Sequence, residues 1–400
     1  MTRPLFQPKG CNRREFLLAS GIVVVGGLVS CEQSGKSPKQ QVTKKTKILQ
    51  VKNIPIRVRI GKNIHRVTID GKVLTAKNIA DDSKTIELSS PSEVKIDHRT
   101  KKITGHIVLH RRKDQTNTFD VVAHVPIEQY LPGVLAGELF AYWHPTTFIA
   151  QAVAARSYAV YEHLARKDAS HFDVEDGPSS QMFLGEVTLD VAHRAAKESE
   201  GIVLAWNGEV IPAYYCACCG GVAATASDAI SGAAIHNIPP LQGQGGVDVC
   251  TELDIHKWSA IRSSRTVRRR LNACAGTMSI PEFSSVRTIR SVKPSTTNKH
   301  GRPTSLAIYD RTNNRTEVRA RDFIRAVNAT ISTLPKPTPT IWSSNLVAHK
   351  QGTNIQFEGT GMGHGVGLCQ YGAQERAGKG ESWEEILSWY YPKATISEQM

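Results

Sequence analysis

Apolar and polar positions alternate along the first part of the chain. Short runs of alternating residues, broken by Gly, Asn and Asp, recur between residues 48 and 118. Such alternation is typical of strands that bury one face. The clearest runs cover residues 56–60, 65–70, 86–88, 94–96 and 103–109. We therefore expect a β-rich accessory region over residues 48–118.

A helix follows where the apolar spacing changes. A further strand is expected over 118–125, ending at a turn at Pro126. Beyond it, Pro145 supplies a helix start, and apolar side chains then recur at helical spacing: Phe148, Ile149, Ala152, Val153, Val160 and Leu164. This spacing predicts an Ala-rich helix over about 146–166. Asn207-Gly208, between the apolar runs 202–206 and 209–213, predicts a β-hairpin with a type I′ turn.

The remaining pattern completes an α+β fold. Residues 262–340 alternate basic and β-branched side chains and predict an inserted β-rich segment. We expect the β-rich accessory region to be followed by a mixed α/β domain over 119–397, with the Ala-rich helix at its centre and a C-terminal helix. The chain has 400 residues, of which 40% are hydrophobic, which is enough to bury sizeable cores.

The N-terminal residues resemble an export signal. Arg13 and Arg14 precede an apolar run that ends at Leu28, and Leu28-Val-Ser-Cys31 reads as a lipoprotein cleavage box. The run is too short for a comfortable membrane-spanning helix. We expect a twin-arginine signal over 1–31, lipid on Cys31 and a polar linker over 32–47, so that the chain is exported and anchored on the periplasmic side. In the alternative, an ordinary signal, Cys31 is incidental.

One carboxylate has a setting that suits acid–base chemistry. Glu138 lies in a Gly- and aromatic-rich stretch ahead of the predicted helix, near Phe140, Tyr142 and Trp143. Partial desolvation by such rings favours the neutral form of a carboxyl group, which a general acid needs at neutral pH. Alternatively, Glu138 caps the helix or forms an ion pair.

Three blocks of sequence resemble one known family. The first is 131–159, which contains Gly133-Val-Leu-Ala-Gly-Glu138 and Gln151-Ala-Val-Ala-Ala-Arg156-Ser-Tyr158-Ala. The second is Gly361-Met-Gly-His364-Gly-Val-Gly367 through Ala373, closed by the helix-like run 383–392, and the third is 199–221. These blocks are similar to the stage II sporulation protein D family, also called the LytB-type or amidase-enhancer domain. The likeness runs in order from about 120 to 395.

This resemblance implies a membrane-tethered peptidoglycan lytic transglycosylase. Such an enzyme cleaves the MurNAc–GlcNAc bond of peptide-stripped glycan and leaves 1,6-anhydroMurNAc ends, with Glu138 as the single acid and base. One carboxylate suffices because the attacking hydroxyl belongs to the sugar itself. The competing readings are a non-catalytic activator of an N-acetylmuramoyl-L-alanine amidase and a structural wall-binding lipoprotein. We expect the substrate-binding residues to include Trp143, Gln151, Arg156, Tyr158, Gln181, His364, Gln370 and Tyr371.

Two of these expectations have structural alternatives. Four glycines at alternate positions from Gly361 to Gly367 cannot all serve packing, so we expect them to bend the backbone and bring His364 and amide groups to a ligand. His364 is otherwise a structural histidine in a tight loop. Arg156 either binds a substrate carboxylate or forms a buried pair. A Cys–His protease using Cys369 and His364 is disfavoured because no nucleophile elbow is recognisable.

The cysteines favour disulfides over a metal site. Of eight cysteines, six remain once Cys11 is removed with the signal and Cys31 is lipidated. An even number outside the cytoplasm favours disulfides, and Cys250–Cys274 and Cys219–Cys369 are the first pairs to test. No cofactor is required, although zinc on Cys216, Cys218 and Cys219 is an alternative. Some members of the resembled family carry zinc elsewhere, at positions matched here by Glu175, Ser179 and Ser180, so that site is expected to be lost.

The net charge of +14 calls for an acidic partner. Nucleic acid is one reading, and export argues against it. Glycan strands stripped of their peptides expose a lactyl carboxylate, and a basic groove would favour them. We therefore expect glycan strands, a membrane reached through the lipid anchor, and a cell-wall amidase as partners, and no nucleic acid. The candidate basic residues are Arg262, Arg265, Arg268, Arg269, Arg270, Arg287, Arg290 and Lys293.

Overall fold

The computed structural model describes residues 54–89, 91–112, 117–230 and 234–398. These residues form two compact units, and each is described by itself. Within the described ranges, unit 1 comprises Lys257–Thr297 and Pro303–Thr360, and unit 2 comprises the rest. The expected export signal, Cys31 and the linker lie outside the described residues. Among the helices within them, none is long and apolar enough to cross a membrane.

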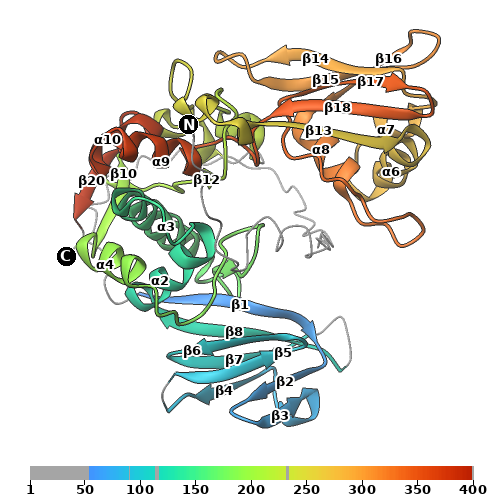
Figure 1. Cartoon of the computed structure of the whole chain (residues 1–400). Coiled ribbons are helices and arrows are strands. Elements are labelled where there is room, and N and C mark those ends of the chain that lie inside the picture. Colours follow the sequence, from blue (N-terminus) through green and yellow to red (C-terminus); the bar gives the residue numbers. More distant parts are fainter. Residues whose placement is uncertain (1–53, 90, 113–116, 231–233, 399–400) are drawn as a thin grey trace, which may run out of the picture. The chain divides into compact units, whose positions relative to one another are not determined.

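Unit 2 begins with two sheets, drawn in blue and blue-green in Figure 1. The strand orders are β4-β7-β8-β1-β9 and β3-β2-β5-β6. The strands are β1 (Pro55–Ile64), β2 (Arg66–Ile69), β3 (Lys72–Thr75), β4 (Ser83–Glu87), β5 (Ser92–Ile96), β6 (Arg99–Ile103), β7 (His106–Arg111), β8 (Phe119–Pro126) and β9 (Val174–Glu175), with a short 3-10 helix η2 (Ala76–Asn78). The N-terminal region is thus β-rich, as the alternation predicts. The expected boundary at 118/119 falls inside a sheet, because β8 pairs with both β7 and β1.

Three helices pack beside the sheet that contains β1 and β8: two contact its strands, and the third packs on the other two helices. They are α2 (Ile127–Glu138), α3 (Pro145–Arg166) and α4 (Asp190–Glu198). The start of α3 matches the prediction: Pro145 occupies its first turn, and the His144 side chain accepts a hydrogen bond from the Thr146 N–H. The pattern did not predict α2, whose sequence contains Pro132, Gly133 and Gly137. Prolines and glycines of this kind are more typical of loops.

The end of the chain completes unit 2. Asn207 and Gly208 have φ values of 52° and 80° and join β10 (Ile202–Trp206) to β11 (Glu209–Val210), which confirms the predicted hairpin. β10 also pairs with β20 (Thr395–Glu398), and β12 (Tyr215–Cys216) pairs in parallel with β19 (Leu368–Cys369). The helices here are α5 (Ala226–Ala229), α9 (Gln370–Gly378), α10 (Trp383–Tyr390) and the short 3-10 helices η3 (Ala234–Asn237), η4 (Pro239–Leu241), η5 (Val249–Glu252) and η6 (Asp254–His256).

Unit 1 corresponds to the predicted insertion and has its own hydrophobic core. Its six-stranded sheet has the order β13-β18-β17-β14-β15-β16. Phe283, Phe323 and Phe357 are fully buried between this sheet and the helices. The strands are β13 (Lys257–Ser263), β14 (Ser291–Thr297), β15 (Pro303–Tyr309), β16 (Arg315–Arg319), β17 (Leu346–Gln351) and β18 (Asn354–Thr360), and the helices are α6 (Ser264–Thr277), α7 (Glu282–Ser285) and α8 (Ala320–Asn328).

Two half-buried histidines of the N-terminal sheet predict sensitivity to acid. Burial, together with a neighbouring histidine in each case, lowers the pKa of His110 and of His124 from 6.5 to about 4. The unfolded chain therefore binds more protons than the folded one between pH 6.5 and 4. We expect the free energy of unfolding to fall by several kcal/mol as the pH is lowered through this window, because each pKa unit corresponds to about 1.4 kcal/mol for each histidine. Urea unfolding at a series of pH values measures the slope, which should flatten in the His124→Gln variant. An unchanged slope in that variant would contradict the assignment.

Candidate active site

Glu138 is the last residue of α2 and its carboxylate is held from two sides. The side chain is 4% exposed. Oε1 accepts a hydrogen bond from the Met182 backbone N–H at 2.8 Å, and Oε2 accepts one from Gln370 Nε2 at 3.1 Å. The turn 139–144 separates Glu138 from α3, so the prediction that it lies just ahead of that helix needs a correction. His144 caps the N-terminus of α3, so Glu138 does not have the capping role that the sequence left open.

Aromatic rings gather beside this carboxylate. The Trp143 and Tyr371 ring centroids are 5.0 Å apart in an edge-to-face arrangement, and Phe140 lies 5.4 Å from Trp143. Tyr371 directly follows Gln370, which bonds Glu138. Trp143 is buried, whereas Tyr142 is 76% exposed and stacks on Phe140. The structure therefore brings together Glu138, Trp143, Gln370 and Tyr371 from distant parts of the sequence, and leaves one ring of the cluster open to solvent.

Gln181 supports the backbone that holds Glu138. Its buried amide accepts a hydrogen bond from the Tyr130 hydroxyl at 2.9 Å and donates to Ala155 O and to the Tyr215 hydroxyl. These contacts tie Gln181 to α2, α3 and β12, immediately before the Met182 N–H that bonds Glu138. A substrate could not reach this amide without displacing an internal partner. The structure thus indicates a positioning role for Gln181.

Two residues of α3 differ sharply in how their polar atoms are used. Arg156 is fully buried: Nε and Nη2 bond the Glu128 carboxylate at 2.9 and 2.7 Å, and the other contacts are to Ser199 Oγ and two backbone carbonyls. This is the buried pair left open by the sequence, and substrate binding by Arg156 is not supported. Gln151 is also fully buried, yet among the described residues neither amide atom has a hydrogen-bond partner. Substrate binding by Gln151 stays a prediction.

The glycine-rich loop 361–367 folds tightly against neighbouring backbone. Gly361, Gly363, Gly365 and Gly367 all have positive φ, between 67° and 104°. A Cβ atom at Gly367 would lie 2.0 Å from Tyr214 O, and one at Gly365 would lie 2.6 Å from the Arg302 guanidinium. Clashes of 2.9–3.0 Å would follow at the other two positions. The expectation that these glycines cannot all serve packing is therefore wrong, since each permits a close contact.

His364 makes internal contacts at the centre of that loop. Its Nδ1 accepts the Val366 N–H at 3.0 Å, and its ring contacts Tyr214 edge to face. Burial, and then the charge of Arg302, lower its pKa to about 4, so the ring is neutral near pH 7 with the proton on Nε2. Tyr158, another expected binding residue, bonds Ser180 Oγ at 3.4 Å and is partly buried. Substrate contacts of His364 and Tyr158 stay predictions.

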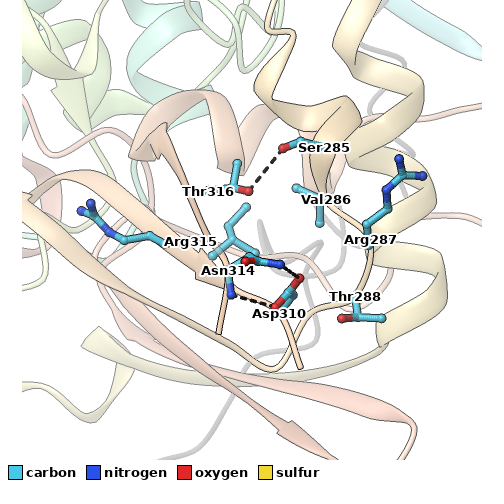
Figure 2. Close-up of a pocket in the computed structure, with 9 residues that line it drawn as sticks. Ser285, Val286, Arg287, Thr288, Asp310, Asn314, Arg315 and Thr316 are labelled. Atoms are coloured by element: carbon cyan, nitrogen blue, oxygen red, sulfur yellow. Dashed lines mark hydrogen bonds between the residues drawn. The ribbon is translucent and has the colours of Figure 1, made fainter. Parts of the chain in front are cut away.

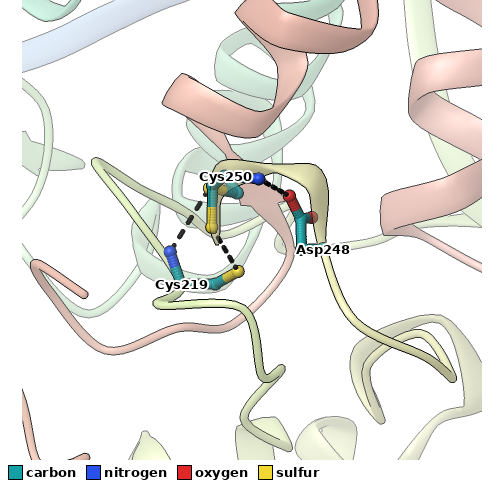
Figure 3. A group of neighbouring side chains, drawn as sticks. Cys219, Asp248 and Cys250 are labelled. Carbon is teal, nitrogen blue, oxygen red and sulfur yellow. Dashed lines mark hydrogen bonds between the residues drawn. The ribbon is translucent and has the colours of Figure 1, made fainter. Parts of the chain in front are cut away.

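The described cysteines are all free thiols, and four of them converge. Hydrogen bonds from neighbouring thiols lower the pKa of the Cys250 thiol; the largest effect comes from Cys218, followed by Cys219 and Cys369. Figure 3 shows Cys219 beside Cys250, with their sulfurs 3.5 Å apart, and Asp248 next to them. Cys219 and Cys369 lie close together, but both are free thiols, and the expected disulfide between them is not formed. Burial raises the pKa of the Cys369 thiol, which argues against the nucleophile of the Cys–His alternative.

The other expected pair, Cys250–Cys274, is contradicted. Cys250 is buried in the core of unit 2, and Cys274 is buried in the core of unit 1, where its sulfur lies 4.0 Å from Ala326 O. A disulfide between them would require both cores to open. The alternative metal set Cys216, Cys218 and Cys219 also needs revision, because the ligand atoms that lie close together belong to Cys219, Asp248, Cys250 and Cys369.

The basic residues of unit 1 divide into internal and exposed ones. Arg262 is buried and donates to Pro339 O and Val327 O, and Arg270 is buried and donates to Ala329 O and Pro335 O. These two guanidinium groups satisfy backbone carbonyls and are not part of a binding surface. Arg268 is partly buried and donates to Arg287 O. The remaining members of the expected set are exposed: Arg265, Arg269, Arg287, Arg290 and Lys293.

A surface depression of unit 1 contains none of the expected substrate-binding residues. It lies between α7 and the β15–β16 turn (Figure 2). Its polar groups are largely used in local contacts: Asp310 accepts hydrogen bonds from Thr312 and Asn314, and Ser285 bonds Thr316. Of the expected basic residues, Arg287 alone lines it. The depression therefore reflects the shape of a turn, and Glu138 does not line it.

Comparison with known proteins identifies the family of the chain. The family model for stage II sporulation protein, SpoIID, matches residues 115–206, which include Glu138, α3 and Gln181. An uncharacterized protein of Brachyspira hyodysenteriae is 30% identical over 277 residues, covering 69% of this chain and 67% of that protein. The chain belongs to the SpoIID/LytB family. Membership indicates a role related to the cell wall.

Named relatives in the SpoIID/LytB family share the same region. The amidase enhancer of Bacillus subtilis is 26% identical over a region that covers 67% of this chain and 40% of that protein. Stage II sporulation protein D of Bacillus amyloliquefaciens is 23% identical over 69% of this chain and 76% of its own length. A second model, for a domain of unknown function, matches residues 241–367 and so includes unit 1.

Proposed function

We propose that this SpoIID/LytB protein is a peptidoglycan lytic transglycosylase in which Glu138 is the acid and the base. The observation that carries the proposal is the carboxylate itself, buried at the end of α2 with each oxygen held by a donor from a different segment. A general acid must be placed within hydrogen-bond reach of the atom it protonates, and two fixed hydrogen bonds restrict the orientation of the group.

The proposed reaction uses one carboxyl group twice. The protonated Glu138 donates its proton to the glycosidic oxygen as the bond from that oxygen to the anomeric carbon of MurNAc breaks. The MurNAc 6-hydroxyl oxygen then forms a bond to the same carbon, and the Glu138 carboxylate takes its proton. No water is consumed, and Glu138 returns to its starting state. Holding the hydroxyl within the same sugar replaces a second reactant.

The surroundings of Glu138 fit a sugar substrate. Gln370 is fully buried, and its hydrogen bond to Oε2 holds the Glu138 carboxyl group in one orientation for the substrate. The exposed Tyr142 ring and its stacked neighbour Phe140 offer a flat apolar face beside polar groups. The exposed basic residues of unit 1 would attract the lactyl carboxylates of stripped glycan, with an attraction that weakens as salt is raised.

A second candidate function is activation of a cell-wall amidase. The relative named amidase enhancer supports it, since it is 26% identical over 67% of this chain. One assay separates the two functions: stripped glycan is incubated with the protein alone, and intact peptidoglycan is incubated with an amidase in its presence and absence. New anhydro ends in the first reaction support the transglycosylase. Stimulation of the amidase by both wild type and Glu138→Gln, with no anhydro ends, would support the activator and reject the enzyme.

We also propose that the protein is exported and anchored through lipid on Cys31. The paired Arg13 and Arg14 and the cysteine at the end of the apolar run are the support. Replacing Cys31 by Ala is expected to move the protein from the membrane fraction to a soluble or precursor pool, because that cysteine carries the only proposed lipid. Cell fractionation with an immunoblot measures this, and Cys274→Ala serves as the matched control. A fully processed, membrane-bound Cys31→Ala protein would contradict the anchor.

A further inference from the structure

Four buried side chains from three segments of unit 2 meet at one point. Cys219 follows β12, Asp248 and Cys250 begin η5, and Cys369 ends β19. Each is at most 1% exposed, and their candidate ligand atoms all lie within 4.8 Å of one another. In Figure 3 the Cys219 and Cys250 sulfurs face each other, with the Asp248 carboxylate beside them. Such mutual distances allow one atom to contact all four groups.

Backbone amides point at the sulfurs of this cluster. Cys250 Sγ accepts the Gly221 N–H at 3.2 Å, and Cys369 Sγ accepts the N–H groups of Cys219 and Gly372, both at 3.3 Å. Hydrogen bonds of this kind stabilise thiolates and commonly reach the sulfurs of metal-bound cysteines. A Cβ at position 372 would lie 2.4 Å from Asp248 Oδ1, so this glycine makes room for the carboxylate.

A buried cation also borders the cluster. Arg302 is 1% exposed and donates hydrogen bonds to the carbonyl oxygens of Cys219, Val222 and Gly363. Its guanidinium contributes one positive charge against as many as four negative charges on three thiolates and a carboxylate. Burying so many anionic ligands without further positive charge is costly. A divalent cation bound between them would supply that charge.

We propose that Cys219, Cys250, Cys369 and Asp248 bind a zinc ion. Three sulfurs and one carboxylate oxygen form a four-ligand set of the kind that tetrahedral zinc accepts. Disulfides explain less of the arrangement, because one disulfide joins only two of the four convergent sulfurs, and even two disulfides would leave the buried Asp248 carboxylate beside them without a role. The Cys218 thiol also bonds Cys250 and Cys369, and it lies outside the proposed ligand set.

The zinc would stabilise the position of a residue that bonds Glu138. Cys369 caps α9 by accepting the Gly372 N–H, and Gln370, the first residue of that helix, donates to Glu138 Oε2. Cys219 and Cys369 are 150 residues apart in sequence, so a shared metal would join distant segments directly behind the candidate active site. With four protein ligands, the site is a closed, structural one. Zinc binding does not depend on which reaction Glu138 performs.

Elemental analysis of the purified full-length protein tests the proposal. We expect one zinc per chain, and thiolate-to-cobalt charge-transfer absorption when cobalt replaces the zinc. Cys250→Ser should remove both signals, whereas the control Cys274→Ser, changed in the other core, should keep both. Asp248→Asn should reduce zinc retention against a chelator by at least about tenfold. The Cys218→Ser variant should retain one zinc. If Cys218→Ser lost the zinc and Asp248→Asn kept it, the proposed ligand set would be wrong.

Counting free thiols tests the disulfide alternative. Because it is done on the denatured wild-type protein, it does not require any variant to fold. In the denatured wild-type protein without reductant, the three cluster cysteines should react as free thiols once a chelator removes the zinc. A chelator should also lower the unfolding temperature, and a reductant should not. Missing thiols with no bound metal would overturn the proposal in favour of disulfides. These measurements involve no enzymatic activity, so their outcome is independent of whether the transglycosylase proposal is correct.

Discussion

Replacing Glu138 by Gln is expected to reduce the release of 1,6-anhydromuramyl products by about 100- to 10,000-fold. The amide has nearly the same shape, and its oxygen can still accept the Met182 N–H, but it cannot donate and recover a proton at neutral pH. Binding to stripped glycan should therefore change little. Product release is measured by chromatography of muropeptides, and binding by cosedimentation with the glycan.

The Glu198→Gln variant is the matched control for this experiment. Glu198 is exposed at the end of α4, and the same chemical change there should leave the rate within error of wild type. Thermal unfolding of all three proteins shows whether the fold is retained. A Glu138→Gln protein that still forms anhydro products at the wild-type rate would rule out Glu138 as the acid.

Replacing Gly367 by Ala is expected to lower the free energy of unfolding by about 3 kcal/mol or more. The added Cβ would lie 2.0 Å from Tyr214 O, at a residue whose φ is +67°. Backbone cannot move aside as cheaply as the end of a side chain, so the loop and the adjoining β19 must shift. Because Gln370 follows β19, the same change should also reduce activity.

Gly378→Ala provides the control, since no atom lies within 4 Å of a Cβ at the end of α9. In a helix this substitution should be neutral or stabilising by up to about 1 kcal/mol. Urea unfolding followed by circular dichroism compares the two variants. Equal stabilities for Gly367→Ala and wild type would show that the loop does not have the close contact described here.

Local features of the sequence predicted the elements that depend on local interactions. Pro145 and the Ala-rich spacing predicted α3 to within one residue of its start, and Asn207-Gly208 predicted the hairpin. The helix α2 was missed because its glycines look like loop residues. In the fold they permit close packing: a Cβ at Gly133 would lie 2.2 Å from Gly185 O, and one at Gly137 would lie 2.9 Å from Met182 O. Tertiary contact therefore outweighed helix propensity.

The candidate site was predicted in part. Glu138 was recognised from its motif, but its bond to Gln370 joins residues 232 positions apart, and no local pattern encodes such a contact. The internal roles of Arg156 and Gln181 depend likewise on partners from other segments. The cysteine cluster was misassigned because its members come from three segments that are far apart in sequence, and spacing along the chain favoured the neighbours Cys216, Cys218 and Cys219.

Mass spectrometry of the products from stripped glycan distinguishes the proposed transglycosylase reaction from hydrolysis. The purified protein is incubated with peptidoglycan from which an amidase has removed the peptides. The proposed reaction forms a ring inside MurNAc without consuming water. We expect fragments that end in 1,6-anhydroMurNAc and lack the mass of one water relative to hydrolytic products. Fragments with free reducing ends, or no fragments at all from a folded and glycan-binding protein, would contradict it.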